Sequence, residues 1–197
     1  DFFINHFFKE FKDYLPESKF SGGSENKKWA KEIMKGGYIL HFRHAEREKW
    51  IDVAMYDALE SDVHNNGKNG TRFAEKDFFD KAVCLNSRGK VQSKAMGEHL
   101  TNIGFPIGFV ISSPSCRSRQ TANLAFGGYD KLDRELVHPG PYTENKKIRV
   151  EILKDLYNSL PLEKGKNTIV SAHNSVILKD LFANKNSIRD RLRLEEG

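Results

Sequence analysis

Hydrophobic positions follow two alternating patterns through the middle and the end of the chain. Short apolar runs are typical of buried strands, and segments with apolar residues at every third or fourth position are typical of helices. Strands separated by helical crossovers predict an α/β fold, a three-layer sandwich in which helices cover both faces of a mostly parallel sheet. In chain order the predicted elements are a strand at 38–42, a helix at 91–103, a strand at 109–111, helices at 116–126 and 148–160, a strand at 168–172 and a helix over 176–181.

Residues 1–35 lie outside this alternation, and we expect them to form an N-terminal helical extension of a main domain at 36–197. Aromatic residues recur at helical spacing over 3–14, before Pro16 ends the pattern. Such a face more commonly docks on the protein's own core, and contact with a membrane surface is the less favoured alternative. A second short helix is expected around 29–34.

Residues 45–84 form a long insertion, because forty residues exceed a normal connection between a strand and a helix. Glycine and asparagine lie at its centre, and Trp50, Tyr56, Phe73 and Phe78 flank them. This aromatic content favours an ordered cover that shapes a pocket.

Composition restricts the class of protein. The 197 residues are 38% apolar and 30% charged, which predicts a globular chain with one sizeable core. A mean hydropathy of -0.62 and the lack of an 18-residue apolar run argue against a spanning helix. The net charge of +5 is spread along the chain and favours anionic ligands weakly. Because there is no basic stripe with aromatic platforms, we expect no nucleic-acid partner.

The two cysteines, Cys84 and Cys116, leave two alternatives open. They form either one disulfide in an oxidising compartment or two thiols in a reducing one. A periplasmic or secreted location is slightly favoured over the cytoplasm. A start at Asp1 predicts a processed or trimmed chain.

The candidate chemistry lies at three strand ends. Arg43 and His44 follow the first predicted strand, Arg117 follows the second near a helix start, and His173 follows the last. Ligands of open α/β sheets bind beyond the carboxyl ends of the strands. A guanidinium matches phosphate oxygens, and an imidazole can attack phosphorus or donate to the transferring group. Each residue alone is more often structural, but together they predict a phosphate site.

Metal-ligand spacings are missing from the sequence. The seven histidines show no His-x-x-x-His pattern and the cysteines no Cys-x-x-Cys pattern. We therefore expect a protein that uses no metal and no other cofactor.

Four segments in the same order resemble motifs of the histidine phosphatase superfamily, also called phosphoglycerate mutase-like. They are Arg43-His44, 85–93, 112–122 and Ala172-His173. Ala45 stands where the family usually has glycine. Within the superfamily, the strings around Arg43, Cys84 and His173 are most similar to periplasmic lipopolysaccharide core heptose phosphatases.

The resemblance implies a fold, an activity and a site. It implies that His44 is the nucleophile, that Arg43, Arg117 and His173 form the phosphate pocket, and that Cys116 is not catalytic. The expected activity is that of a metal-independent phosphomonoesterase, acting through phosphohistidine on a phosphorylated small molecule such as a sugar phosphate. A mutase is the near alternative, and a phosphate-binding module that has lost turnover is the alternative from a different class.

The proton donor to the leaving alcohol stays open among four residues. The candidates after the arginine-bearing helix are Asp133, Glu135, His138 and Glu144. Arg119 is expected at the surface or behind the pocket, because the family motif places its arginine at position 117.

Overall fold

A computed structural model of the chain describes residues 24–48, 81–137 and 146–173. The chain divides into two compact units, residues 1–34 and 35–197. The first unit contains the helix α2 (Ser24–Ile33). Within the described ranges, no helix is both long and apolar enough to cross a membrane.

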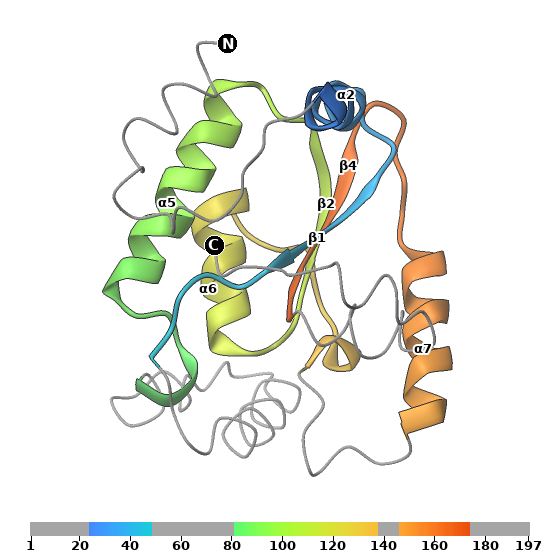
Figure 1. Cartoon of the computed structure of the whole chain (residues 1–197). Coiled ribbons are helices and arrows are strands. Elements are labelled where there is room, and N and C mark those ends of the chain that lie inside the picture. The colour runs from blue at the N-terminus through green and yellow to red at the C-terminus, as the bar shows by residue number, and fades with distance from the viewer. Residues whose placement is uncertain (1–23, 49–80, 138–145, 174–197) are drawn as a thin grey trace. The chain divides into compact units, whose positions relative to one another are not determined.

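The second unit is built on a parallel sheet (Figure 1). In the described ranges its strands are β1 (Ile39–Arg43), β2 (Ile107–Ser112), β3 (Lys131–Leu132) and β4 (Asn167–Ala172), arranged in the order β1-β4-β2-β3. All the neighbouring strands pair in parallel. The central strand β4 is buried along its whole length, as expected for a strand covered on both faces.

Side chains that alternate along the strands build a separate core on each face. Val110 of β2 and Ile169 of β4 pack with Ala122 of α6 (Cys116–Phe126). The next residues along, Ile111 and Val170, pack with Leu153 of α7 (Lys146–Ser159). Figure 1 shows α6 and α7 on opposite sides of the sheet, with α5 (Ser87–Asn102) beside α6. The predicted α/β class, with helices on both faces of a parallel sheet, is confirmed.

The buried face of α5 differs from the expected apolar stripe. Its fully buried residues are Gly89, Ser93 and Gly97, whereas Val91 is 62% exposed. A Cβ at Gly97 would lie 2.6 Å from the carbonyl oxygen of Leu124 in α6. Small residues are therefore needed where the helices approach closely, and period alone could not distinguish this face from the apolar one.

In α7 the apolar stripe is only partly buried. Leu153 is fully buried, but Ile148 and Ile152 are exposed.

β3 and the 3-10 helix η2 (Arg134–Leu136) were not predicted, because elements of two and three residues are too short to show a period.

Several predicted features lie outside the described residues. These are the aromatic helix over 3–14, most of the insertion (49–80), His138, Glu144 and the helix over 176–181.

Candidate functional site

The parallel sheet brings three loops to one edge. The backbone N–H of His44 donates to the carbonyl of Ala172 at 3.0 Å, and that of Ser113 donates to the carbonyl of Ser171 at 2.9 Å. The segments that leave β1 and β2 are thus both hydrogen-bonded to the end of β4. This pairing brings together the loops that carry His44 and His173 and the start of α6, which carries Arg117.

The imidazoles of His44 and His173 face each other. Their ring centroids are 5.3 Å apart, and the rings meet edge to face at 66°. Both side chains are buried, with 4% and 1% exposure. A separation of roughly 4 to 8 Å suits two imidazoles that share one phosphoryl group. The predicted proximity is observed, and the catalytic roles of the two residues stay predictions.

The protonation state of His44 follows from its hydrogen bond. Its Nδ1 lies 2.8 Å from the carbonyl oxygen of Ala45. A carbonyl only accepts, so Nδ1 carries the proton and Nε2 keeps its lone pair. Burial, followed by the charge of Arg117, holds the pKa of His44 well below its usual value. The imidazole is therefore neutral, with one nitrogen available to attack an electrophile.

Arg117 lies at the start of α6 and reaches the second imidazole. Its guanidinium is 1% exposed; Nη2 donates to Nδ1 of His173 at 3.3 Å and Nη1 donates to the carbonyl of Val83 at 3.3 Å. Because a guanidinium cannot accept, the proton of His173 is on Nε2, which donates to Oγ of Ser113 at 3.2 Å. Arg117 and Ser113 together orient the His173 ring.

Arg43 ends β1, directly before His44, and pairs in register with Ala172. Its charge and that of Arg47 further lower the pKa of His44, after the larger effects of burial and Arg117. Three cationic side chains thus act on one neutral histidine. Such a concentration of positive charge favours a bound anion.

Thr121 joins the loop that follows His44 to the first turn of α6. Its Oγ1 accepts from the backbone N–H of Ala45 at 3.0 Å and donates to the carbonyl of Arg117 at 2.8 Å. The side chain is fully buried. Sequence reasoning assigned no role to Thr121 or to Ser113, although both lie in the 112–122 motif, because their partners are distant in the chain.

The 85–93 motif holds the loop after His44 in place. Glu46 accepts from the Asn86 side chain at 3.0 Å and forms an ion pair with Arg88 at 3.3 Å. The N–H of Glu46 donates to the Gln92 side chain at 3.2 Å. A Cβ at Gly89 would lie 2.0 Å from the Glu46 carbonyl oxygen, so the first turn of α5 needs glycine at this contact.

Cys84 and Cys116 form a disulfide, which is one of the two cysteine states that the sequence left open. Cys116 directly precedes Arg117, and Cys84 directly follows Val83, whose carbonyl accepts from that arginine. The bond therefore links the two segments that surround the guanidinium. Cys116 carries no thiol in this form.

Arg119 lies behind the loop that precedes α6. It is 7% exposed, and its Nε donates to the carbonyl of Pro114 at 2.9 Å. The predicted surface position of Arg119 is therefore wrong.

The structure describes two of the four proton-donor candidates. The carboxylate of Asp133 accepts from the N–H of Glu135 at 3.0 Å and pairs with Lys131 at 3.0 Å, so it serves as the cap of η2. Glu135 is half-buried.

Among the residues with described positions, no group of three His, Cys, Asp or Glu side chains could hold a metal ion.

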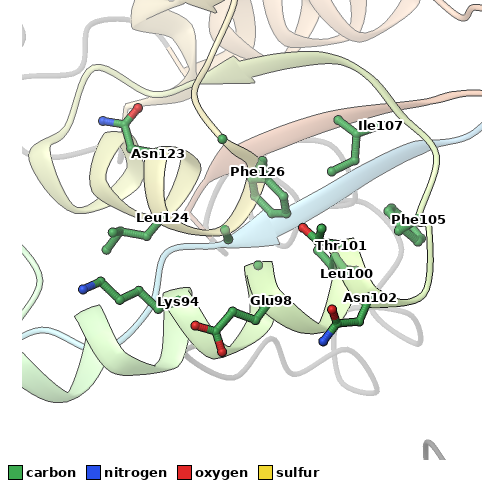
Figure 2. A pocket seen from close by; sticks show the side chains of 13 residues that line it. Lys94, Glu98, Leu100, Thr101, Asn102, Phe105, Ile107, Asn123, Leu124 and Phe126 are labelled. Atoms are coloured by element: carbon green, nitrogen blue, oxygen red, sulfur yellow. The ribbon is translucent and has the colours of Figure 1, made fainter.

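A groove of about 690 Å³ lies between α5 and α6 (Figure 2). Its walls include Glu98 and Phe105 together with Asn123 and Phe126 from the last turns of α6. Arg117 lies at the opposite end of that helix. The groove contains none of the predicted site residues.

Residues 78–136 match the family model described as the histidine phosphatase superfamily (branch 1). The sequence of this segment is similar to that superfamily. The match includes the 85–93 and 112–122 motifs and ends before His173. It supports the expected superfamily, whereas no comparison supports the closer resemblance to heptose phosphatases. No curated protein matches the chain.

Three solved structures are similar to the chain at low identity. The putative phosphohistidine phosphatase SixA from Agrobacterium tumefaciens is 18% identical, with 78% of this chain and 80% of that chain covered and a TM-score of 0.46. Rv3214 from Mycobacterium tuberculosis is 15% identical, with 80% and 86% covered and a TM-score of 0.48. Phosphoglycerate mutase from Plasmodium falciparum is 19% identical, with 50% and 62% covered and a TM-score of 0.38. At these values the three structures carry no information about the activity of this chain.

Proposed function

We propose that the protein is a metal-independent phosphomonoesterase that forms a phosphohistidine on His44. The observation that carries the proposal is the buried, neutral His44, whose unprotonated Nε2 belongs to a ring 5.3 Å from that of His173. The match of residues 78–136 to the histidine phosphatase superfamily supports the same reaction class.

The reaction consists of two displacements at phosphorus. The Nε2 lone pair of His44 attacks the phosphomonoester, an N–P bond forms, and the P–O bond to the alcohol breaks as the alcohol takes up a proton. Water then attacks the phosphohistidine, the N–P bond breaks, and inorganic phosphate leaves. The attacking water gives a proton to the base that the first step left behind, and this second step alone regenerates the neutral imidazole.

The neighbouring side chains suit the charges that develop. The Nδ1–H bond to the Ala45 carbonyl stabilises the imidazole as Nε2 becomes bonded to phosphorus. Arg43 and Arg117 supply positive charge for the equatorial phosphate oxygens, and His173 faces the same space. These roles are part of the proposal.

The proposed substrate is a small phosphomonoester or a sugar phosphate. The support is the resemblance of the strings around Arg43, Cys84 and His173 to lipopolysaccharide core heptose phosphatases. A panel of sugar phosphates that includes a heptose phosphate tests this part of the proposal separately from the chemistry.

Hydrolysis of p-nitrophenyl phosphate, with and without EDTA, tests the reaction class. We expect turnover that EDTA does not change. If the protein binds phosphate or vanadate without any turnover of the panel, the alternative of a binding module replaces the phosphatase.

A further inference from the structure

Beneath the candidate site, three successive carbonyls at the end of β4 each accept a hydrogen bond from a different neighbour. Ser171 accepts from the N–H of Ser113, and Ala172 accepts from the N–H of His44. The carbonyl of His173, one residue further, accepts from Nε2 of His41 at 3.1 Å. A side chain of β1 thus continues the ladder past the end of the strand.

The other ring nitrogen of His41 contacts α7. Nδ1 lies 2.6 Å from the hydroxyl of Tyr157, and the two rings stack at 18° with centroids 6.4 Å apart. The His173 carbonyl can only accept, so Nε2 of His41 carries the proton and the Tyr157 hydroxyl donates to Nδ1. The relay runs from Tyr157 through His41 to the backbone of His173.

Burial keeps both groups in the protonation states that this relay requires. It lowers the pKa of His41 to about 4 and raises the pKa of the Tyr157 hydroxyl. At neutral pH both side chains are uncharged, and each has one proton to donate.

We propose that His41, oriented by Tyr157, is a positioning residue that holds the backbone of His173 so that its imidazole faces His44. This inference rests on the proposed function. The His173 side chain is fixed on its other side by Arg117 and Ser113, so release of its carbonyl would let the backbone shift against these two contacts. Displacement of a reacting group by about 1 Å can reduce a rate by about 100-fold.

The test uses substitutions at both ends of the relay. His41→Leu removes the donor to the His173 carbonyl and is expected to lower kcat for p-nitrophenyl phosphate by roughly 10- to 100-fold, with KM changed less than about threefold. His41→Gln places an amide N–H near the same carbonyl and is expected to recover kcat to within about threefold of the wild type. Tyr157→Phe keeps the ring and removes the hydroxyl, and it is expected to lower kcat roughly three- to tenfold.

Thr168→Val is the matched control. Thr168 lies on the same strand β4, at its opposite end, and its hydroxyl donates to the carbonyl of Pro161. The substitution removes a buried side-chain bond without touching the site. It is expected to lower the thermal unfolding temperature and to leave kcat unchanged.

A double-mutant cycle with His173→Ala separates positioning from general stability. In that background His41→Leu and Tyr157→Phe should each change kcat by less than about twofold, because the imidazole they position is gone. Equal losses in both backgrounds would overturn the inference. So would a kcat within twofold of the wild type in a folded Tyr157→Phe variant.

A readout that needs no turnover keeps the two proposals distinguishable. Long-range 1H–15N spectra should show the Nε2–H form of His41 and of His173 in the wild type. In His41→Leu and Tyr157→Phe the His173 nitrogens should shift, and in Thr168→Val they should not. A wild type with these spectra but no phosphatase activity would remove the proposed function and leave the positioning contact. Unchanged His173 signals in the relay variants would remove the inference alone.

Discussion

His44 and His173 approach edge to face at 5.3 Å although they lie at the ends of two different strands. The contact exists because β1 and β4 are adjacent and parallel, with Arg43 opposite Ala172, so the next residue of each strand enters the same space. His44 has its Nδ1 proton on the Ala45 carbonyl, and His173 has its Nε2 proton on Ser113. Two neutral rings with opposite tautomers therefore face each other, and Arg117 donates to one of them.

Substitution of His44 distinguishes a nucleophile from an electrostatic contact. His44→Ala removes the atom that would bond to phosphorus and should reduce kcat by several orders of magnitude, while vanadate binding through Arg43 and Arg117 stays detectable. If His44 only bound phosphate, its removal would lower kcat by about 100- to 1,000-fold. Rapid quench with a labelled phosphomonoester should trap an acid-labile, base-stable phosphoenzyme in the wild type. A burst without any such species would favour direct attack by water.

The hydroxyl of Thr121 should matter for both stability and rate. Thr121→Val leaves the buried N–H of Ala45 without its acceptor and is expected to cost about 1–3 kcal/mol in free energy of unfolding. Because the same oxygen ties this loop to the Arg117 carbonyl, kcat should fall roughly tenfold. Thr121→Ser keeps the oxygen and is the control, and urea unfolding with p-nitrophenyl phosphate kinetics measures both effects. Similar values for the two variants would contradict the role of the hydroxyl.

The disulfide should contribute stability and little to the chemical step. The double substitution Cys84→Ser with Cys116→Ser should lower the free energy of unfolding by about 2–4 kcal/mol. The contact of Arg117 with His173 does not involve either sulfur, so activity should stay within about tenfold. Denaturant titration and steady-state kinetics at low temperature check the two parts. A greater loss of activity in a folded variant would give the disulfide a direct role at the site.

The close contact between Gly89 and Glu46 predicts a size-sensitive position. Gly89→Ala introduces a Cβ 2.0 Å from a backbone oxygen and should destabilise the fold by roughly 1–3 kcal/mol or more, because backbone on both sides must move. Lys90→Ala, at an exposed position of the same helix, should change stability by less than about 0.5 kcal/mol. Thermal unfolding compares the two, and equal melting temperatures would contradict the contact.

Stability should fall as the pH drops below about 6.5. Burial, first among the causes, lowers the pKa of His41 from 6.5 to about 4 and that of His44 well below 6.5. The unfolded chain binds these protons first, so the stabilisation is complete above pH 6.5 and is lost progressively toward pH 4. Each histidine contributes at most roughly 1.4 kcal/mol per pH unit. Urea unfolding from pH 8 to pH 5 should show a shallower slope for His41→Gln than for the wild type, and identical slopes would contradict the assignment.

The α/β class and most of the regular elements were readable from the sequence. Strands β1, β2 and β4 were predicted from short apolar runs, and β4 is buried along its whole length whereas β1 is half-buried. The helix α6 has the bounds expected from its period, and Gly127 caps it in the left-handed region at φ 79°. The arginines and histidines at the strand ends were also found from the sequence, because parallel strands bring their carboxyl ends to one edge.

Tertiary structure decided the features that depend on residues far apart in the chain. The buried side of α5 is its glycine and serine face, because the backbone of α6 approaches too closely for larger side chains. The state of the two cysteines depended on the distance between them, which the sequence does not contain. In the sequence His41 is one more position of a predicted strand. Only the packing of α7 brings Tyr157 close to it, and only the pairing of β1 with β4 brings the His173 carbonyl close to it. Local pattern determines which segments form strands and helices, whereas hydrogen-bond partners and tautomers are set by contacts that form only when those segments pack.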